Sequence, residues 1–183
     1  MGNGGQTLSE YTAHFAAWCV AKFPLILGFD LEAPRCRDCA PGGAEVLSLL
    51  LNRELVAINA DPLGVPAAPR GWARVAGDAG AAASVWAGPL AGAAYALLLL
   101  NTGSGNATSA SVDLTAVLGV AAGTPFSCRD VLARRDCGSI TAGAANLSTP
   151  LPSHSAAVFV LRRVRRRAAQ QRAPPPPGCS LGR

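Results

Sequence analysis

The sequence has 183 residues, half of them apolar, and a formal net charge of +5. This length allows one domain or two small ones, and the apolar content is enough to build a buried core. The charge is uneven: seven arginines and no acid follow Leu161, which leaves residues 1–161 with nine basic and eleven acidic groups, a net −2. Composition therefore argues against a basic globular surface for nucleic acid, and no apolar run approaches the roughly 20 residues of a membrane span.

A helix is predicted to begin near the N-terminus. Thr7 and Glu10 have the spacing of a capping box, in which each side chain accepts from the other residue's backbone N–H. Apolar residues then recur every three or four positions up to Cys19, which is typical of one buried helical face. Pro24 ends this helix, and the continuous apolar run 25–28 predicts a short strand covered on both faces.

A second helix and a second strand are predicted next. Residues 45–52 have a helical apolar face, and the short apolar run 55–59 reads as a buried strand that ends in polar Asn59 and Asp61. Strand, helix and strand together indicate a parallel βαβ unit. Such a unit needs further strands to bury its faces.

The rest of the chain is predicted to be β structure. Residues 67–83 are rich in Ala, Gly, Pro and Arg and read as a linker. Short strand candidates separated by turn residues follow, which favours an antiparallel β-sandwich; they are 85–86, 93–101, 111–114, 126–132, 139–142 and 156–164.

The C-terminal residues 163–183 have no foldable pattern and are predicted to be a disordered Arg- and Pro-rich tail. A basic run can grip phosphates, but no aromatic residue interleaves it for base stacking. A solvated tail is favoured over a nucleic-acid arm, which remains an alternative.

Cysteine and histidine spacing does not indicate a metal site. Cys36 and Cys39 form one C-x-x-C, but a structural zinc site needs four ligands and no second pair follows. His14 and His154 stand alone in the sequence, and a packed His14 is favoured over a ligand. We therefore predict no metal and no cofactor.

Two features would matter in an oxidising, secretory compartment. Cys128 and Cys137 flank a plausible hairpin and could pair there. Asn106 and Asn146 begin N-glycosylation sequons in turn-like positions. Chance occurrence of the sequons is the alternative.

A set of short motifs, in order along the chain, resembles the C-terminal half of the α-galactosidases (melibiases) of glycoside hydrolase family 27. The set is specific although no single motif is; it comprises Gly2–Gly5, Ser9–Tyr11, His14–Phe15, Trp18, Lys22–Leu25, Gly28–Asp30, Glu45–Ser48, Val56–Asn59, Asp61–Gly64, Val85–Leu90 and Arg129–Asp130.

The resemblance implies an α/β plus all-β architecture: the last two βα units of a (β/α)8 TIM barrel, then a C-terminal antiparallel β-sandwich. Residues 1–66 would be the barrel remnant, with the seventh strand at 25–28 and the eighth at 55–59. Residues 67–83 would be the linker, 84–162 the β domain and 163–183 the tail.

The resemblance also implies retaining hydrolysis of terminal α-linked galactose by two aspartates, one the nucleophile and the other the acid/base. In the family both aspartates precede the segment that Gly2–Gly5 matches, so no catalytic residue is assigned here. We expect this chain to be inactive alone. Asp30 and Asp61, after the two predicted strands, are interpreted as structural, and Leu27 is the one candidate substrate-pocket residue.

The family implies α-galactoside oligosaccharides as ligands and a secreted, cell-wall or vacuolar location. An alternative function is a non-catalytic carbohydrate-binding or scaffold protein built on the β domain. Its main aromatic residues, Trp86 and Tyr95, fit a core better than a sugar platform.

Overall fold

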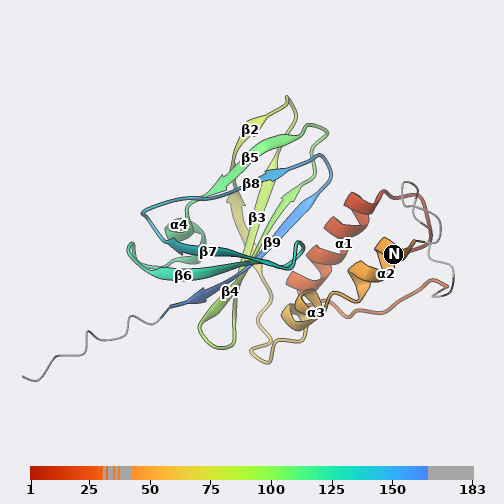
Figure 1. Cartoon of the computed structure of the whole chain (residues 1–183), viewed down its shortest axis with the longest axis horizontal. Helices are drawn as coiled ribbons and strands as arrows, with labels where there is room; N and C mark the ends of the chain where they lie inside the picture. The colour runs from red at the N-terminus through yellow and green to blue at the C-terminus, as the bar shows by residue number, and fades with distance from the viewer. Residues whose placement is uncertain (31, 33–34, 36, 38–42, 165–183) are drawn as a thin grey trace, which may run out of the picture.

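A computed structural model describes residues 1–30, 32, 35, 37 and 43–164. In these residues, three helices near the N-terminus lie against one face of a large β-sheet, and a smaller sheet lies on its other side (Figure 1). The tail from residue 165 and the cysteines 36, 39 and 179, with the predictions made for them, lie outside the described residues. No helix in the described part of the chain has the length and apolarity of a membrane span.

The first helix is the one that the sequence predicts. Helix α1 spans Leu8–Val20, and its capping box is formed: Thr7 accepts from the Glu10 N–H at 3.2 Å, while the Glu10 carboxylate accepts from the Thr7 N–H at 2.7 Å. The buried face of α1 packs on the β-sheet and on the other two helices. The ammonium group of Lys22, just past the helix, donates to the Ile58 carbonyl and so ties α1 to the third helix.

The strand predicted at 55–59 is wrong, and the strand predicted at 25–28 is not paired within the described residues. Residues 55–59 belong to helix α3, which spans Arg53–Asn59, and residues 24–28 have no regular secondary structure. The preceding helix α2, Ala44–Leu50, agrees with the predicted second helix. A five-residue apolar run is compatible with either helix or strand, and here Asn52 decides: its side chain accepts from the N–H groups of Glu54 and Leu55 and caps α3.

The antiparallel β-sandwich predicted for the C-terminal part is confirmed. Every pairing in it is antiparallel, with a six-stranded sheet in the order β1-β3-β4-β9-β6-β7 and a three-stranded sheet in the order β2-β5-β8. The strands are β1 Ala68–Trp72, β2 Arg74–Gly77, β3 Ala83–Leu90, β4 Ala94–Asn101, β5 Ala107–Val112, β6 Pro125–Asp130, β7 Arg135–Thr141, β8 Leu147–Leu151 and β9 Ala156–Arg163; a short helix, α4, spans Leu114–Leu118.

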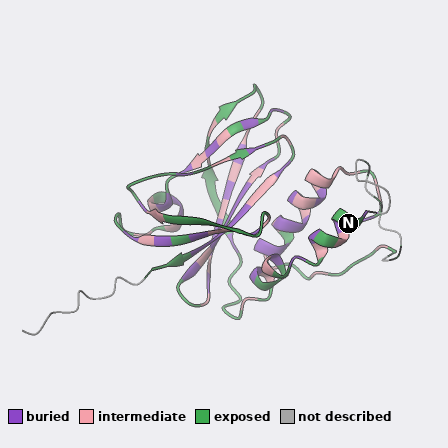
Figure 2. Cartoon of the chain, viewed as in Figure 1, coloured by how far each residue is buried: buried purple, intermediate pink, exposed green. Residues whose placement is uncertain are grey.

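The centre of the large sheet is buried on both faces, which explains the nearly continuous apolar sequence of β4. Leu97 and Leu99 point between the two sheets, whereas Ala96 and Leu98 point at the helices. Alternate side chains of a strand face opposite sides, so one strand contributes to two cores. Figure 2 shows burial running through β3, β4 and β9 at the centre of the molecule, whereas much of β7 is exposed.

Residues 67–83 are not a linker, because they contain β1 and β2, one strand in each sheet. Both strands are short edge strands with mostly exposed side chains, so they lack the apolar alternation by which strands are recognised. Strand β8, which contains Pro150, is also absent from the prediction, again at the edge of its sheet, where a proline is tolerated.

Candidate functional site: the cleft between the helices and the large sheet

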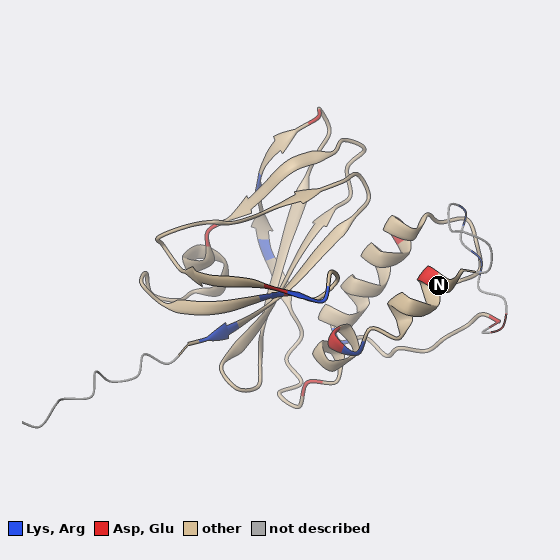
Figure 3. Cartoon of the chain, viewed as in Figure 1, with Lys and Arg blue, Asp and Glu red and all other residues tan. Residues whose placement is uncertain are grey.

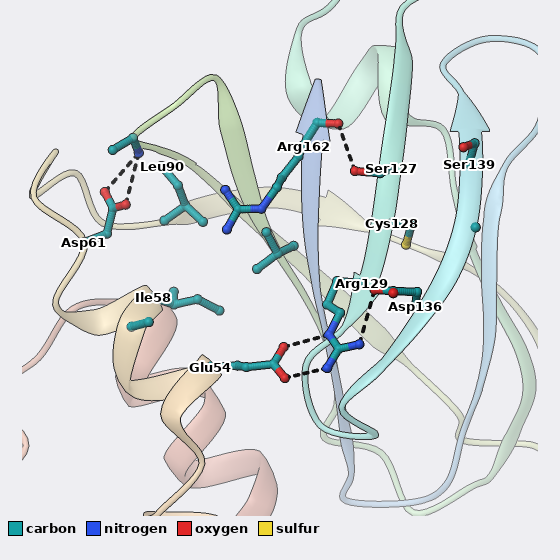
Figure 4. Close-up of a pocket in the computed structure, with 14 residues that line it drawn as sticks. Glu54, Ile58, Asp61, Leu90, Ser127, Cys128, Arg129, Asp136, Ser139 and Arg162 are labelled. Atoms are coloured by element: carbon teal, nitrogen blue, oxygen red, sulfur yellow. Dashed lines mark hydrogen bonds and ion pairs between the residues drawn. The ribbon is translucent and has the colours of Figure 1, made fainter. Parts of the chain in front are cut away.

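A cleft of about 650 Å³ lies between α3 and the large sheet. Figure 4 shows its side chains, which come from α3, the turn after β3, and strands β6, β7 and β9. Charged residues are otherwise sparse over the strands, and Figure 3 shows a group of them where the β6–β7 hairpin approaches α3. The polar and charged residues lining the cleft are Glu54, Asp61, Ser127, Arg129, Asp136, Ser139 and Arg162.

Arg129 is the centre of the cleft's charge network. Its guanidinium donates to both carboxylate oxygens of Glu54, Nε to Oε2 at 2.9 Å and Nη2 to Oε1 at 2.7 Å, and Nη1 donates to Asp136 Oδ1 at 3.2 Å. This two-pronged geometry fixes the side chains in direction as well as in distance. The pair joins the first turn of α3 to β6, and so links the helices to the sheet.

The network also sets the charge state of its members. The hydrogen bond from Arg129 is the largest effect on Glu54, and it lowers the pKa of the carboxyl group. Burial, the second effect in size, raises this pKa, and the attraction of the guanidinium charge lowers it again, so that the pKa is lowered overall. The hydrogen bond to Glu54 in turn raises the pKa of Arg129. Glu54 is thus held as a carboxylate, and it is unsuited to donate a proton as a general acid near neutral pH.

Asp61 is structural, in agreement with its interpretation from the sequence. Both of its carboxylate oxygens accept from the Ala91 N–H, at 3.1 and 3.0 Å, and Oδ1 also accepts from the Leu63 N–H at 3.1 Å. Ala91 lies in the β3–β4 turn. Asp61 therefore attaches the segment that follows α3 to the large sheet. Asn59 connects the end of α3 to the segment after α1, because its side chain donates to the Phe23 carbonyl at 2.9 Å.

Asp30 and Asp61 have different partners and do not form a pair of acids. Asp30 Oδ1 accepts from the Glu32 N–H at 2.9 Å in an exposed turn and does not line the cleft. Retaining glycoside hydrolysis needs two carboxyl groups facing each other across the sugar. The three acids among the described residues of the cleft, Glu54, Asp61 and Asp136, are already held by Arg129 or by backbone N–H groups.

Leu27 lies away from the cleft, in a separate apolar hollow of about 150 Å³ beside α1. Its side chain is half-exposed. The hollow is formed by Met1, His14, Phe15, Trp18 and the run Pro24–Leu27. Its role as a substrate-pocket wall stays a prediction.

His14 packs against an aromatic neighbour. Its ring contacts the edge of Trp18 with the ring centres 5.7 Å apart, and burial lowers its pKa. Among the described residues, no group of three His, Cys, Asp or Glu side chains is placed to hold a metal ion.

The aromatic residues of the β-sandwich divide into two kinds. Trp86 is partly buried against the helical core, and Tyr95 meets Phe126 edge-on with ring centres 6.0 Å apart, so both have structural positions. Trp72 is different, because it is 70% exposed on the edge strand β1. Sequence reasoning placed Trp72 in a linker and so missed it.

Glu54 and Arg129 were likewise not singled out as partners from the sequence, because they are 75 residues apart and belong to elements of different type. A sequence signal does exist for Glu54: it follows the helix-capping Asn52 and is the acid of the first turn of α3.

The family model described as the alpha galactosidase C-terminal beta sandwich domain matches residues 80–161. Alpha-galactosidase 3 of Arabidopsis thaliana is 33% identical over 162 residues, which cover 88% of this chain and 33% of that protein. An alpha-galactosidase of Coffea arabica is 34% identical over 164 residues, covering 88% of this chain and 37% of the relative. Residues 80–161 belong to the α-galactosidase C-terminal β-sandwich family, and the chain as a whole is similar to α-galactosidases. It spans about a third of the length of these α-galactosidases.

Solved α-galactosidase structures support the fold. The alpha-galactosidase of Saccharomyces cerevisiae, solved with raffinose, superposes with a TM-score of 0.73 at 22% identity, covering 89% of this chain and 45% of that one. Alpha-galactosidase I of Mortierella vinacea gives a TM-score of 0.70 at 23% identity over 88% of this chain and 37% of that one. At these identities the likeness establishes the arrangement of the α-galactosidase fold and nothing about substrate.

Proposed function

We propose that this chain forms the C-terminal part of an α-galactosidase-type retaining glycoside hydrolase that removes terminal α-linked galactose from oligosaccharides and galactoconjugates. The observation that carries the proposal is the match to two plant α-galactosidases, at about a third identity over 88% of the chain. A secreted, cell-wall or vacuolar location follows from the same family assignment.

Residues 1–66 would complete the catalytic barrel. Because residues 55–59 are helical, we assign a single barrel strand to this region: residues 24–28, between α1 and α2, which would become a strand by pairing with the other strands of a complete barrel. Its apolar side chains support this role, since Phe23 is 52% and Ile26 86% exposed, next to half-exposed Leu27. A barrel strand buries such residues against neighbouring strands.

The isolated 183 residues would not hydrolyse α-galactosides. In the family, the nucleophile and the acid/base precede the segment that Gly2–Gly5 matches, and the described acids of the cleft between α3 and the large sheet hold the fold together instead. Without those two carboxyl groups neither covalent attack on the sugar nor protonation of the leaving oxygen can occur.

A domain-exchange experiment tests the proposal. The matching C-terminal third of the Coffea arabica α-galactosidase is replaced by residues 1–164 of this chain, and hydrolysis of an aryl α-galactoside is measured for the chimera and for the chain alone. We expect activity from the chimera and none from the chain. A folded, inactive chimera would contradict the proposed role, and hydrolysis by the chain alone would contradict the missing-carboxylate argument.

Exposed Trp72 favours one second candidate, a non-catalytic carbohydrate-binding protein, because an exposed aromatic face can stack on a sugar ring. Titration of the full chain with α-galactosides, followed by tryptophan fluorescence, separates the two functions. Saturable binding that is lost in Trp72→Ala but kept in Trp86→Phe would favour the binding protein. No saturable change would leave the hydrolase proposal as the better account.

A further inference from the structure

Two cysteines face each other across the β6–β7 hairpin. The strands are in register with Cys128 opposite Gly138 and Arg129 opposite Asp136, so a bulge leaves Cys137 as the extra residue between two paired positions. A bulge turns the extra residue's side chain away from the regular alternation of the strand. Cys137 therefore lies next to Cys128 rather than one position away from it.

Both cysteines line one hollow of about 400 Å³, together with residues of β8 and the turn before it. Cys128 is buried in the core between the two sheets, whereas Cys137 is exposed. Both are free thiols in the structure. The Cys137 thiol is thus open to a reagent from solvent, and the buried Cys128 thiol can react with Cys137 from the core side.

The surroundings of Cys128 change its reactivity. Burial, the neighbouring Cys137 thiol and the Asp130 carboxylate together raise the pKa of Cys128 to about 12. Since the thiolate is the nucleophile in thiol–disulfide exchange, Cys128 is slow to react with a reagent by itself. Exposed Cys137 is the thiol that a reagent meets first.

We propose that Cys128 and Cys137 are a disulfide-forming pair, closed by thiol–disulfide exchange with a small-molecule disulfide oxidant. The Cys137 thiolate attacks one sulfur of the oxidant, forming a mixed disulfide and releasing one thiol of the oxidant. The Cys128 sulfur then gives up its proton and attacks the Cys137 sulfur, releasing the second thiol. Two protein thiols are oxidised and one disulfide is reduced to two thiols.

The hairpin gives this bond a structural consequence. Arg129 and Asp136, which form the neighbouring cross-strand pair, follow Cys128 and precede Cys137 in the chain. A disulfide between Cys128 and Cys137 would fix the register of β6 and β7, and with it the position from which Arg129 donates to Glu54. The proposal does not depend on the proposed hydrolytic function, since it concerns the hairpin alone.

The sequence allows a direct test. The folded full chain is treated with oxidised glutathione, its remaining thiols are alkylated without reduction, and it is digested with trypsin. Cys128 and Cys137 fall in different peptides, 75–129 and 136–162, each with a single cysteine. We expect these two peptides joined, with the loss of two hydrogen atoms, and the link abolished by reduction.

Three variants sharpen the result. In Cys128→Ser we expect glutathione to accumulate on Cys137, because the resolving thiol is missing. In Cys137→Ser, a change at an exposed position, we expect Cys128 to stay reduced. Cys19→Ser is the control: Cys19 is fully buried, and burial raises its pKa to about 12, so its loss should leave the 128–137 link intact.

The proposal is overturned if the unmodified chain keeps glutathione on Cys137, or if Cys137 is found joined to a cysteine other than Cys128. It is also overturned if both peptides carry only the alkylating group after oxidation. A second measurement guards against misfolded variants: oxidation should raise the urea midpoint of the unmodified chain but not that of Cys137→Ser.

Discussion

The buried side chain of Asn52 makes three hydrogen bonds, two within the helical layer and one to the β-sandwich. Its Oδ1 accepts from the N–H groups of Glu54 at 3.0 Å and Leu55 at 3.3 Å, capping α3, and its Nδ2 donates to the Val131 carbonyl at 3.0 Å. Val131 follows β6, so one amide both starts a helix and anchors it to the sheet.

Replacing Asn52 by alanine removes both functions. Loss of a helix cap costs about 1 kcal/mol. Leaving a buried carbonyl without its donor costs about 2 kcal/mol more. We expect Asn52→Ala to lower the free energy of unfolding by about 3 kcal/mol, equivalent to roughly 6–12 °C in the melting temperature of a chain of this size.

Asn52→Ser separates the two contributions. A serine hydroxyl can accept from the helix N–H groups but is too short to reach Val131, so we expect a loss of about 2 kcal/mol. Asn59→Ala is the matched control, because Asn59 ends the same helix but its hydrogen bond to Phe23 is exposed, and it should cost about 1 kcal/mol or less.

Urea denaturation followed by far-ultraviolet circular dichroism measures all three variants. The reasoning would be refuted if Asn52→Ala were no more destabilised than Asn59→Ala. Equal losses in Asn52→Ala and Asn52→Ser would assign the whole effect to Val131 and none to the helix cap.

Two other predictions concern the Glu54–Arg129 pair between the layers and the close packing of Gly88 in the large sheet. The pKa of Glu54 is lowered, so its pairing with Arg129 stabilises the fold above the ordinary Glu pKa of about 4.3 and is lost as the pH falls through the lower, folded value. Glu54→Gln should therefore lower the urea midpoint at pH 7, and the difference from the unmodified chain should shrink as the pH falls below about 4; a constant difference would refute this. Gly88→Ala should destabilise by about 2 kcal/mol, because its Cβ would come within 2.7 Å of the Ala67 backbone. Gly28→Ala, where a Cβ meets nothing within 4 Å, should leave the melting temperature almost unchanged, and equal losses in the two variants would contradict the packing argument.

The sequence predicted those elements whose local signals agree with their packing. The capping box at Thr7 and Glu10 located α1, and the apolar run of β4 located the central strand of the sandwich. The resemblance to α-galactosidases was confirmed by relatives that match most of the chain.

Prediction failed where a short apolar run had to be assigned without its surroundings. Residues 55–59 read as a buried strand when taken alone, but the preceding Asn52 and Glu54 are the signals of a helix start. Strands β1 and β2 were missed for the opposite reason, since their side chains are mostly exposed and their backbone pairing decides their structure.

The network in the cleft was beyond sequence reasoning, because it depends on how α3 lies on the sheet. No pattern within α3 or β6 indicates that Glu54 and Arg129 meet. Asp61 and Asp30 each accept from backbone N–H groups of turns, as a structural role would have them do.

The two-sided burial of β4 has a consequence for dividing this protein. A polypeptide cut to the β domain alone, residues 84–162, would turn Ala96 and Leu98 outward to water and remove β1 from the edge of the large sheet. A broad apolar sheet face beside an open edge is a template for self-association. The sandwich therefore needs its three helices attached to keep this face of the large sheet covered.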